Sequence, residues 1–322
     1  MRDIAIIGAG MAGLACATRL KEQGRSVTVF DKGRGPGGRM ATRRAQVAGD
    51  TVSFDHGVQY FTVRDTGFAN AVAGWQHADV VAPWPAAGDD AMVGIPSMNA
   101  PIRRMAAAVD VHWATRIEAI ERSEHGWRVI FEDGSGRDGG ASDFRQVIIA
   151  VPAEQAMPML SAIELPVAAN WSARARASTS SPCWAVMATF SHTLPLADTF
   201  RGTEITWAAR NSAKPGREAG EHWVIHGSSA WSAHHLELDP EQAGEALLER
   251  FCAETDVAET RPLHLAAHRW RFAKAQTAGR SKQAGFLWDA PSGFGVCGDW
   301  LASPRVEGAW VSGNGLARAV AS

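Results

Sequence analysis

A glycine-rich stretch near the start of the chain constrains the fold more than any other feature. Residues 4–7 form a short apolar run typical of a buried parallel strand, and the pattern G-x-G-x-x-G follows in residues 8–13. Residues 14–24 have a helix-forming composition and end at a glycine typical of a helix C-terminus. Residues 27–30 are β-branched or apolar and predict a second strand. This order of strand, glycine turn, helix and strand predicts a Rossmann-like α/β unit.

The spacing of the glycines predicts a binding site for a dinucleotide. In such a turn, Gly8 permits the sharp change of direction, Gly10 lets the backbone approach a pyrophosphate, and Gly13 lets the helix pack on the strand. The helix that follows begins near Met11 and Ala12, and its free N–H groups and positive dipole end favour phosphate. A tight packing turn without a ligand is the alternative interpretation.

The residues after the second strand strengthen this prediction. Asp31 lies about 20 residues beyond the glycines, where an acid can accept hydrogen bonds from ribose hydroxyls. The basic, glycine-rich stretch from Lys32 through Gly38 lets the backbone pass close to a ligand. Arg39 follows it and is expected to pair with a phosphate. A flexible basic loop is the alternative for this stretch.

Composition restricts the class of protein. The length of 322 residues allows two domains, and a net charge of −2 provides no basic field for nucleic acid. We expect no membrane partner, because no apolar run is long enough to span a bilayer. A signal peptide is rejected because Asp3 and the glycines interrupt its pattern, so the cytoplasm is the default location. The scattered cysteines and histidines predict neither a disulfide framework nor a metal site.

Two motifs carry a resemblance to a known family. They are residues 31–44 (DKGRGPGGRMATRR), with an acid and G-G-R, and residues 54–65 (FDHGVQYFTVRD), with D-x-G-x-Q-Y-F. Together with G-x-G-x-x-G they resemble the flavin amine-oxidase superfamily, and within it the bacterial renalase-type flavoproteins. The resemblance extends over nearly the whole chain and is most specific at its two ends. It implies that the dinucleotide is FAD.

The resemblance also implies which residues contact FAD outside the first motif. Residues 56–60 would lie close to the flavin, and the backbone near Ile117 would contact the adenosine end. Asp299 would bond the ribityl or phosphate portion, and the N-terminus of the last helix would face the pyrimidine edge, where reduced flavin is negatively charged. The predicted contacts of this second set are His56, Gly57, Val58, Gln59, Ile117, Asp299, Glu307, Gly308 and Ala309. Arg305 is a further candidate that would brace the flavin or the preceding loop.

The remaining patterns predict a Rossmann-like FAD-binding domain with an inserted α+β substrate domain that has a mixed or antiparallel sheet. The FAD-binding domain is expected in residues 1–75, 101–153 and 286–322, with an excursion over 76–100 and the substrate domain over 154–285. Further strands are predicted at residues 54–61, 111–113, 117–120, 127–131, 147–152, 185–190, 205–208, 223–227, 264–272 and 294–297. Further helices are predicted at residues 68–75, 100–109, 240–255 and 306–320, with Ser97 or Asn99 as the expected N-cap of the second, and a hairpin turn at 132–134.

The run 207–217 is the expected substrate-facing stretch, because it resembles the renalase-type pattern W-x-A-x-N-x-x-K-P-G-R. Its three cations beside a tryptophan are expected to steer a phosphate-bearing, aromatic substrate. A solvated basic turn is the alternative, and the tryptophans outside the run could equally be core residues. The candidate catalytic residues are Tyr60, Trp207, Asn211, Lys214, Arg217, Trp231, His268 and Trp288, with Arg269 and Trp270 as further pocket candidates.

Three functions are consistent with these observations. The resemblance implies an oxidase that converts misreduced dihydro isomers of NAD(P) to NAD(P)+, with a small-molecule substrate and oxygen as partners and hydrogen peroxide as a product. A flavin-containing amine oxidase is the second, weakened because Tyr60 is the only tyrosine and a tyrosine pair cannot form. A non-catalytic flavin-binding protein is the third. A desaturase that acts on an apolar substrate is less consistent, because the sequence shows neither the apolar tunnel nor the membrane-binding face that it would need. The sequence leaves the oligomeric state open.

Overall fold

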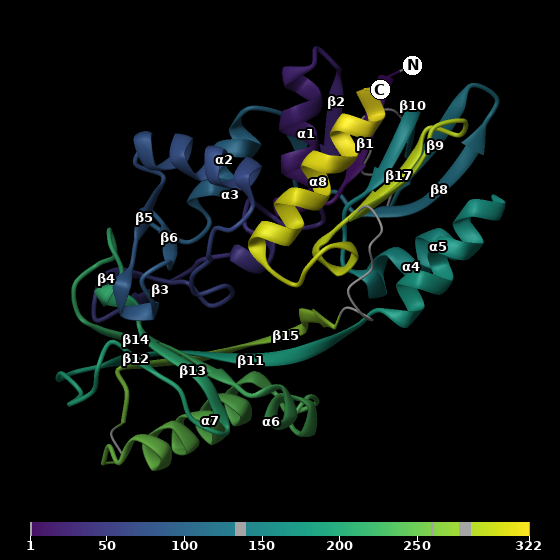
Figure 1. Cartoon of the computed structure of the whole chain (residues 1–322). Helices are drawn as coiled ribbons and strands as arrows, with labels where there is room; N and C mark the ends of the chain where they lie inside the picture. The colour runs from purple at the N-terminus through teal and green to yellow at the C-terminus, as the bar shows by residue number, and fades with distance from the viewer. Residues whose placement is uncertain (1, 133–139, 259–260, 277–284, 322) are drawn as a thin grey trace.

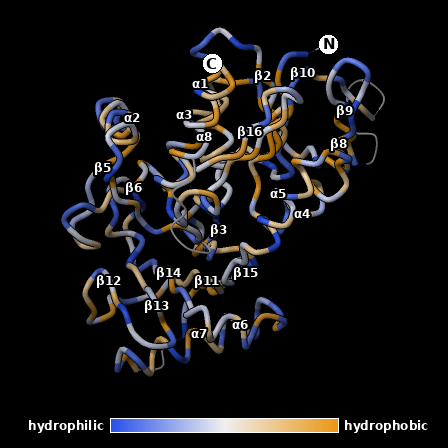
Figure 2. Tube along the Cα trace, turned by 45° about the vertical axis from the view of Figure 1, so that its right-hand side comes forward, coloured by the Kyte–Doolittle hydropathy of each residue, from blue (hydrophilic) through white to orange (hydrophobic). Residues whose placement is uncertain are grey.

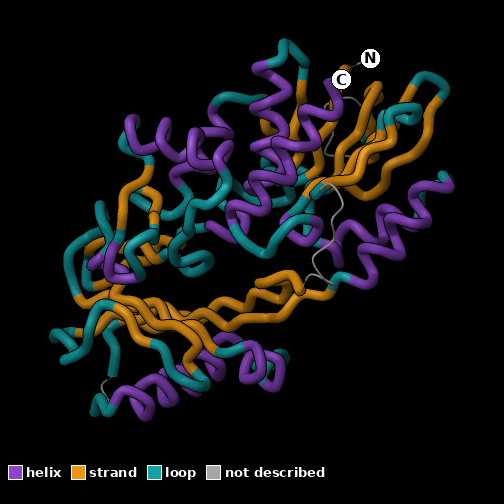
Figure 3. The backbone as a smooth tube through the Cα atoms, in the orientation of Figure 1, coloured by secondary structure: helices purple, strands orange, loops and turns teal. Residues whose placement is uncertain are grey.

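The computed structural model describes residues 2–132, 140–258, 261–276 and 285–321. Two sheets organise it, one in the upper part of Figure 1 and one in the lower part, and a long two-stranded ribbon runs beneath the larger sheet (Figures 1 and 3). The α/β architecture with a second, antiparallel sheet confirms the predicted fold class. Both chain ends lie on the side of the larger sheet, away from the smaller one (Figure 1).

The larger sheet has the order β16-β17-β10-β1-β2-β7, and β9 attaches the β8–β9 hairpin to β10. The pairs from β17 to β7 are parallel, whereas β16 and β9 run antiparallel to their neighbours. Its strands are β1 (Arg2–Ile7), β2 (Val27–Phe30), β7 (Asp110–His112), β8 (Ile117–Ser123), β9 (Gly126–Phe131), β10 (Ala141–Ile149), β16 (Phe286–Asp289) and β17 (Phe294–Cys297).

Helices cover both faces of this sheet. The helices of the chain are α1 (Met11–Glu22), α2 (Thr66–His77), α3 (Ala100–Ala107), α4 (Ala153–Ser161), α5 (Pro166–Ala177), α6 (Ser229–His234), α7 (Pro240–Thr255) and α8 (Val306–Ala321). Short 3-10 turns occur at η1 (Gly38–Met40), η2 (Pro85–Ala87), η4 (Asn211–Ala213) and η5 (Asp299–Leu301). None of the helices among the described residues combines the length and apolarity needed to cross a membrane.

Strand β1 shows why the larger sheet is a buried layer. Its side chains alternate between two cores, as the period of a strand requires. Ile4 and Ile6 pack with α1 and α8, whereas Ala5 and Ile7 pack with α4, α5 and the β8–β9 hairpin. Figure 2 shows hydrophobic residues concentrated in this sheet and in the helices against it. The nucleotide-binding end of the sheet is therefore fixed from both faces.

The smaller sheet is antiparallel, with the order β12-β13-β14-β11-β15. One face packs on α6 and α7, and the other faces the larger sheet, where the hairpins β3–β4 and β5–β6 connect the two parts (Figure 1). The strands of this part are β3 (Arg43–Val47), β4 (Asp50–Phe54), β5 (Val81–Pro83), β6 (Met92–Gly94), β11 (Thr179–Phe190), β12 (Thr199–Phe200), β13 (Ile205–Arg210), β14 (Glu221–Gly227) and β15 (His264–Gln276). Strands β11 and β15 form the long ribbon.

Two predictions of local structure were wrong. Residues 54–61 do not form one strand: β4 ends at Phe54, and an irregular stretch follows because polar contacts of Asp55 and Gln59 replace the ladder. The hairpin turn predicted at 132–134 starts where β9 ends, and β9 pairs antiparallel with β10, as such a hairpin requires; residues 133–134 fall outside the described residues. Helix α3 begins after Asn99, as predicted, but neither predicted side chain caps it.

The predicted start of the substrate domain also differs from the structure. Residues of α4 and α5, such as Leu160 and Trp171, pack in one core with Val147 and Phe294 of the larger sheet. The ring centroids of Trp171 and Phe294 lie 5.1 Å apart. Both helices therefore belong to the first domain, and the second begins at β11. The boundary was misplaced because α4 follows β10 directly and only its packing shows which sheet it covers.

Candidate functional site

A cavity of about 690 Å³ opens where the chain start, the chain end and β15 meet. Residues Trp270 and Phe272 of the ribbon form one wall, and the carboxyl ends of the parallel strands form the other. The predicted cofactor residues that line it are Gly8, Gly10, Met11, Ala12, Asp31, Lys32, Gly38, Arg39, Val58, Ile117, Asp299 and Ala309. Ligands of open parallel sheets bind at this edge of the strands.

The three glycines of the turn have different surroundings. Gly8 has φ +108°, and a Cβ there would lie 2.6 Å from the carbonyl oxygen of Ala150. A Cβ on Gly13 would collide with the carbonyl oxygen of Gly8. A Cβ on Gly10 would meet no protein atom within 4 Å, and Gly10 lines the cavity. Two glycines thus permit helix–strand packing, and the third leaves room for a ligand.

Helix α1 presents unpaired donors to the cavity. Its N-cap residue, Gly10, provides no side-chain cap, and the first intrahelical bond runs from Leu14 N to Gly10 O. The N–H groups of Met11 and Ala12 therefore have no intrahelical acceptor. Such a helix end attracts phosphate. Together with the open position at Gly10, these donors fit the pyrophosphate of a dinucleotide.

Asp31 both braces the glycine turn and lines the cavity. One carboxylate oxygen accepts the N–H of Ala9 at 2.7 Å, and the other accepts the N–H of Gly33 at 2.6 Å. Each oxygen can accept a further bond, so a ribose hydroxyl can still be bound. Lys32 beside it donates to Gln155 Oε1 of α4 at 2.9 Å, which closes this end of the cavity.

Arg39 and Asp299 bind each other in the structure. Two parallel hydrogen bonds of 2.8 and 2.6 Å join the guanidinium to the carboxylate, 260 positions apart in the chain. The sequence predicted that each would contact the ligand separately. Their bidentate pair instead ties the two ends of the chain together beside the cavity, with the remaining N–H groups of Arg39 available to a ligand.

The N-terminus of α8 lies at the cavity, but two of its residues that were predicted to contact FAD, Glu307 and Gly308, contact other parts of the protein. Glu307 accepts the N–H groups of Arg64 and Asp65, both at 2.6 Å, and so holds the loop before α2. A Cβ on Gly308 would collide with the carbonyl oxygen of Ser303, so this glycine serves close packing. Ala309 lines the cavity, as does Val306, at the positive end of the helix dipole.

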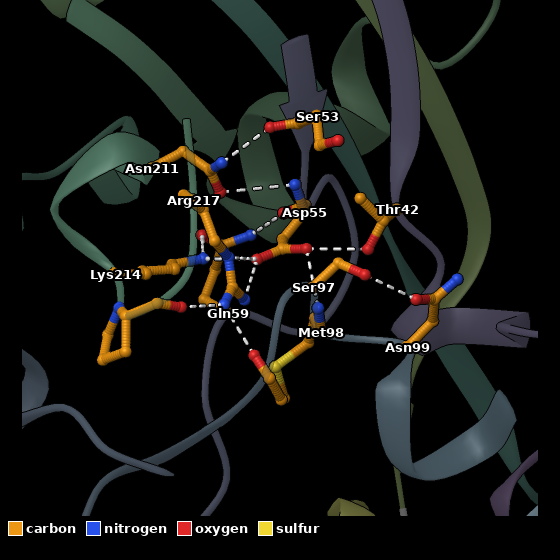
Figure 4. A network of polar contacts seen from close by, with 12 residues as sticks. Thr42, Ser53, Asp55, Gln59, Ser97, Met98, Asn99, Asn211, Lys214 and Arg217 are labelled. Atoms are coloured by element: carbon orange, nitrogen blue, oxygen red, sulfur yellow. Dashed lines mark hydrogen bonds and ion pairs between the residues drawn. The ribbon is translucent and has the colours of Figure 1, made fainter. Parts of the chain in front are cut away.

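Behind the cavity, a buried carboxylate organises the junction of the two domains (Figure 4). Asp55 is fully buried and accepts hydrogen bonds from Thr42 Oγ1 at 2.7 Å and from Met98 N at 2.9 Å. Arg217 donates to its Oδ2 from Nη2 at 2.5 Å and from Nε at 3.1 Å, and Lys214 Nζ lies 3.4 Å from the same oxygen. We call Asp55, Lys214 and Arg217 the Asp55 cluster.

Gln59 connects the Asp55 cluster to the irregular segment 55–61. Its Oε1 accepts a hydrogen bond from Lys214 Nζ at 3.0 Å, and its Nε2 donates to the carbonyl oxygens of Asp55 and Gly57. A Cβ on Gly57 would collide with the carbonyl oxygen of Arg39, so the segment lies tightly against the first domain. One buried network thus joins four predicted site residues: Gly57, Gln59, Lys214 and Arg217.

Burial and neighbouring charges both shift the pKa values of Asp55 and Lys214. Burial opposes the ionisation of Asp55, but Lys214 and Arg217 outweigh it and lower the pKa of this carboxyl. Burial lowers the pKa of Lys214 to about 8, with Arg217 adding to the shift and Asp55 opposing it. Two cations therefore share one carboxylate out of contact with water.

A cross-strand row of the smaller sheet faces the 55–61 segment. Direct register pairs place Trp207, His226, Ala185 and His268 side by side on four strands. The small side chain of Ala185 leaves space in this row. His56 lies against it, with its ring centroid 4.9 Å from that of His268.

His56 connects this row to the cavity wall. Its ring stacks on Trp270 with centroids 5.1 Å apart, and Trp270 Nε1 donates to its carbonyl oxygen at 2.9 Å. His226 Nε2 lies 3.3 Å from the same oxygen. Burial lowers the pKa of both His56 and His226 to about 4, and burial also lowers the pKa of His268. These histidines are neutral at pH 7.

Tyr60 and Trp207 form an aromatic contact beside the row. Their ring centroids are 5.3 Å apart with a tilt of 45°. The guanidinium of Arg201 lies 4.3 Å from the Trp207 ring centroid and donates to Tyr60 Oη at 3.0 Å. Trp207 is 5% exposed, and its indole nitrogen has no hydrogen-bond partner among the described residues.

Several residues that were predicted to be catalytic instead hold parts of the fold together. Lys214 and Arg217 are buried with Asp55, so they are not the exposed cations expected to steer a phosphate. Asn211 accepts from Asp55 N and donates to Ser53 O, which fixes the end of β4. Trp231 packs on the opposite face of the smaller sheet with α7, and Trp288 packs on α8 at the edge of the larger sheet.

The sequence interpretation missed Asp55 as a site residue, although Asp55 stood in the quoted D-x-G-x-Q-Y-F motif. His226 was interpreted as a structural or pocket polar group, but its place in the row could not be predicted, because it depends on register pairs with two other strands. Among the described residues, the structure contains no group of three or more potential metal ligands.

Two family models match the chain. An NAD(P)-binding Rossmann-like domain covers residues 6–73, and a flavin containing amine oxidoreductase covers residues 76–321. A zeta-carotene-forming phytoene desaturase of Myxococcus xanthus is 54% identical over 50 residues, which are 16% of this chain and 9% of the desaturase. A 4,4'-diapophytoene desaturase of Staphylococcus aureus (strain Newman) is 48% identical over 54 residues, 17% of this chain and 10% of the relative. The match thus spans about a tenth of the length of these relatives.

Solved structures share the fold over the whole chain. A candidate protoporphyrinogen oxidase from Exiguobacterium sp. 255-15 has a TM-score of 0.74 at 11% identity. A wild-type putrescine oxidase bound to putrescine has 0.69 at 16%, and a cyclohexylamine oxidase from Brevibacterium oxydans IH-35A has 0.66 at 14%. Each comparison covers 99% of this chain and 98% of the other. At these identities the likeness shows the fold alone.

A flavin family and a cavity built for a dinucleotide agree on one cofactor, FAD. The residues that would hold it come from both ends of the chain and from the ribbon between them. The chain belongs to the flavin containing amine oxidoreductase family and is an FAD-dependent oxidoreductase.

Proposed function

We propose that this chain is a renalase-like oxidase that converts misreduced dihydro isomers of NAD(P) to NAD(P)+. The chemistry that bound FAD supplies is acceptance of a hydride from the substrate and transfer of the electrons to oxygen, which yields hydrogen peroxide. The sequence run 207–217 supports this proposal, since it resembles the corresponding renalase-type run. The four cysteines of the chain are not joined in disulfides, which fits a reducing cytoplasm, and we propose this as the location of the protein.

The observation that carries the proposal is the charge beside the cavity. The buried Asp55 is outnumbered by Lys214 and Arg217, and Asp299 is neutralised by Arg39. The surrounding histidines are neutral, because burial lowers their pKa. Such an interior disfavours a protonated amine and favours a substrate that carries phosphates. An NAD(P) isomer is a substrate of this kind.

The chain's own residues would hold and shield the reactants. The N-terminus of α1 and Asp31 would bind the pyrophosphate and adenosine ribose of FAD, and the Arg39–Asp299 pair would hold the two ends of the chain around it. Trp270 and Phe272 of β15 line the opposite wall, where they would exclude water. Tyr60 and His268 remain the candidates for contact with the substrate.

An anaerobic reductant screen tests the proposal. Purified FAD-loaded protein is mixed with each dihydro isomer of NAD(P), with ordinary NADH and with putrescine, and the flavin absorbance is followed by stopped flow. We expect rapid bleaching by an isomer and none by putrescine. Reduction by ordinary NADH alone, or by none of the isomers, would contradict the proposal.

An amine oxidase is the second candidate, because Tyr60 and Trp207 form an aromatic pair. At a centroid separation of 5.3 Å, however, the two rings contact each other and leave no space for an amine between them. Bleaching of the flavin by putrescine or by cyclohexylamine would support this function. Flavin that no reductant in the screen reaches would instead indicate a non-catalytic flavin-binding protein.

A further inference from the structure

The Asp55 cluster contains an unbalanced charge. The side chains of Lys214 and Arg217 are 0% and 1% exposed, and that of the single carboxylate is 1% exposed. Lys214 also interacts electrostatically with His226 on β14, which is neutral because burial lowers its pKa. Gln59 and the Trp84 ring, 5.3 Å from Lys214 Nζ, complete the surroundings and carry no charge. The cluster therefore holds one net positive charge away from water.

This charge lies one residue behind the cavity wall. Lys214 binds Gln59, and the preceding residue, Val58, lines the cavity. The N–H of Val58 donates to the carbonyl oxygen of Arg39 at 2.8 Å, and Arg39 itself lines the cavity. Lys214 is thus connected to the wall by its hydrogen bond to Gln59, by the backbone from Gln59 to Val58, and by the bond from Val58 to Arg39. Between buried groups, water screens a charge only weakly.

We propose that the surplus positive charge carried by Lys214 raises the reduction potential of the bound flavin. When the substrate gives up a hydride, two electrons and one proton pass to the flavin, which gains one negative charge, and the nicotinamide ring gains one positive charge. A fixed cation behind the wall stabilises the negative charge that reduction adds. Two unit charges about 10 Å apart, at an effective dielectric constant of about 20, shift an equilibrium by roughly tenfold, which is the scale of effect expected for a charge behind the wall.

This inference rests on FAD binding and not on the identity of the substrate. The midpoint potential is measured by equilibration with a redox dye and a chemical reductant, so no substrate is needed. A failed reductant screen would therefore leave the measurement valid, and an unchanged potential would leave the proposed function untouched.

Substitution of Lys214 tests the inference. Lys214→Met removes the charge and keeps the length of the side chain, whereas Lys214→Arg keeps the charge. Arg103→Met, on the exposed side of α3, is the matched control for loss of a cation. We expect Lys214→Met to weaken the preference for reduced flavin by roughly tenfold, which is about 30 mV for a two-electron couple. Lys214→Arg and Arg103→Met are expected to stay near the wild-type potential.

Two results would overturn the inference. One is an FAD-loaded Lys214→Met protein with the wild-type potential, and the other is a Lys214→Arg protein whose potential falls as far as that of Lys214→Met. A purely structural role for Lys214 would affect FAD retention and leave the potential of the loaded fraction unchanged.

A pH series keeps the test decisive if Lys214→Met does not fold. Because burial lowers the pKa of Lys214 to about 8, the wild type should lose the charge above that pH. Arginine stays protonated throughout this range. We expect the potential of the wild type to fall below that of Lys214→Arg above pH 8 and to match it at pH 7. Parallel curves from pH 7 to pH 9.5 would contradict the inference.

Discussion

At the scale of single residues, one buried carboxylate has the widest influence. Asp55 accepts hydrogen bonds from residues of both domains, and its own N–H is bound by Asn211. Burying a carboxylate is unfavourable unless it is paired and hydrogen-bonded, and both conditions hold here. The 55–61 segment can therefore remain irregular and still have a defined position beside the cavity.

Replacing Asp55 with asparagine should destabilise the fold strongly. The variant leaves Lys214 and Arg217 buried without a counter-ion, and loss of one member of a buried pair costs about 3–5 kcal/mol. Urea unfolding at pH 7 measures the change. Asp89→Asn, at an exposed position, is the matched control and should differ from the wild type by less than about 0.5 kcal/mol. An Asp55→Asn protein as stable as this control would contradict the expectation.

The buried histidines should make stability depend on pH on the acid side. The pKa of His226 falls from its ordinary 6.5 to about 4 in the folded chain, because of burial. Between these values the unfolded chain binds more protons, so stability falls as the pH drops from 6.5 towards 4. Urea unfolding at pH 7 and pH 5 should show a smaller loss for His226→Gln than for the wild type. His125→Gln, at an exposed position, should lose as much as the wild type.

The sequence predicted the surroundings of residues whose partners are near in the chain, but not those of Lys214 and Arg217, whose partner is distant. Gly8, Gly13 and Asp31 belong to one strand–helix–strand unit, in which a Cβ on Gly13 would meet Gly8 and Asp31 binds Ala9, so their spacing indicates their positions. Lys214 and Arg217 meet Asp55 only after folding, across 159 and 162 positions. A basic run in the sequence gives no sign that its cations are buried, because burial depends on the packing of the other domain.

At the scale of elements, hydrophobic periodicity was a reliable guide where one element packs on one core. The predicted bounds of β2, α7 and β17 are those of the structure. The pattern failed at residues 54–61, where alternating apolar residues are compatible with a strand but Asp55 and Gln59 bind the backbone instead. Side-chain contacts with other segments, which no local pattern contains, decide such cases.

The glycine turn offers a test that separates packing from ligand binding. Gly13→Ala should destabilise the apoprotein, because its Cβ collides with the carbonyl oxygen of Gly8. Gly10→Ala should leave the apoprotein as stable as the wild type, because its Cβ meets no protein atom, yet reduce FAD affinity at least about tenfold. Thermal unfolding of the apoproteins and FAD titration provide the two measurements. Equal loss of stability in both variants would contradict this assignment.

At the scale of the whole molecule, the cavity joins parts that fold around separate cores. The first domain provides the strand ends and the two helix N-termini, and the second provides the ribbon strand β15. The Asp55 cluster lies at the same junction (Figure 4). A ligand in the cavity therefore contacts both domains and should stabilise them together.

Hydrogen exchange measured by mass spectrometry can detect this coupling. At 100 times its dissociation constant, FAD stabilises the folded state by about 2.7 kcal/mol. We expect slower exchange in the backbone amides of α1 and of β15 near Trp270 when FAD is added. Helix α7, on the opposite face of the smaller sheet, serves as the internal reference. Protection confined to α1 would show that the ribbon does not contact the cofactor.

The pair between Arg39 and Asp299 has a consequence for biosynthesis. A ribosome adds about 5–20 residues per second, so the 260 positions between the two take roughly 13–50 s to make. During that interval the glycine turn is complete, but the partner carboxylate and α8 do not yet exist. Strand β10 also lacks its partner β17 during that time, so we expect the chain to bind FAD stably only after α8 has been made.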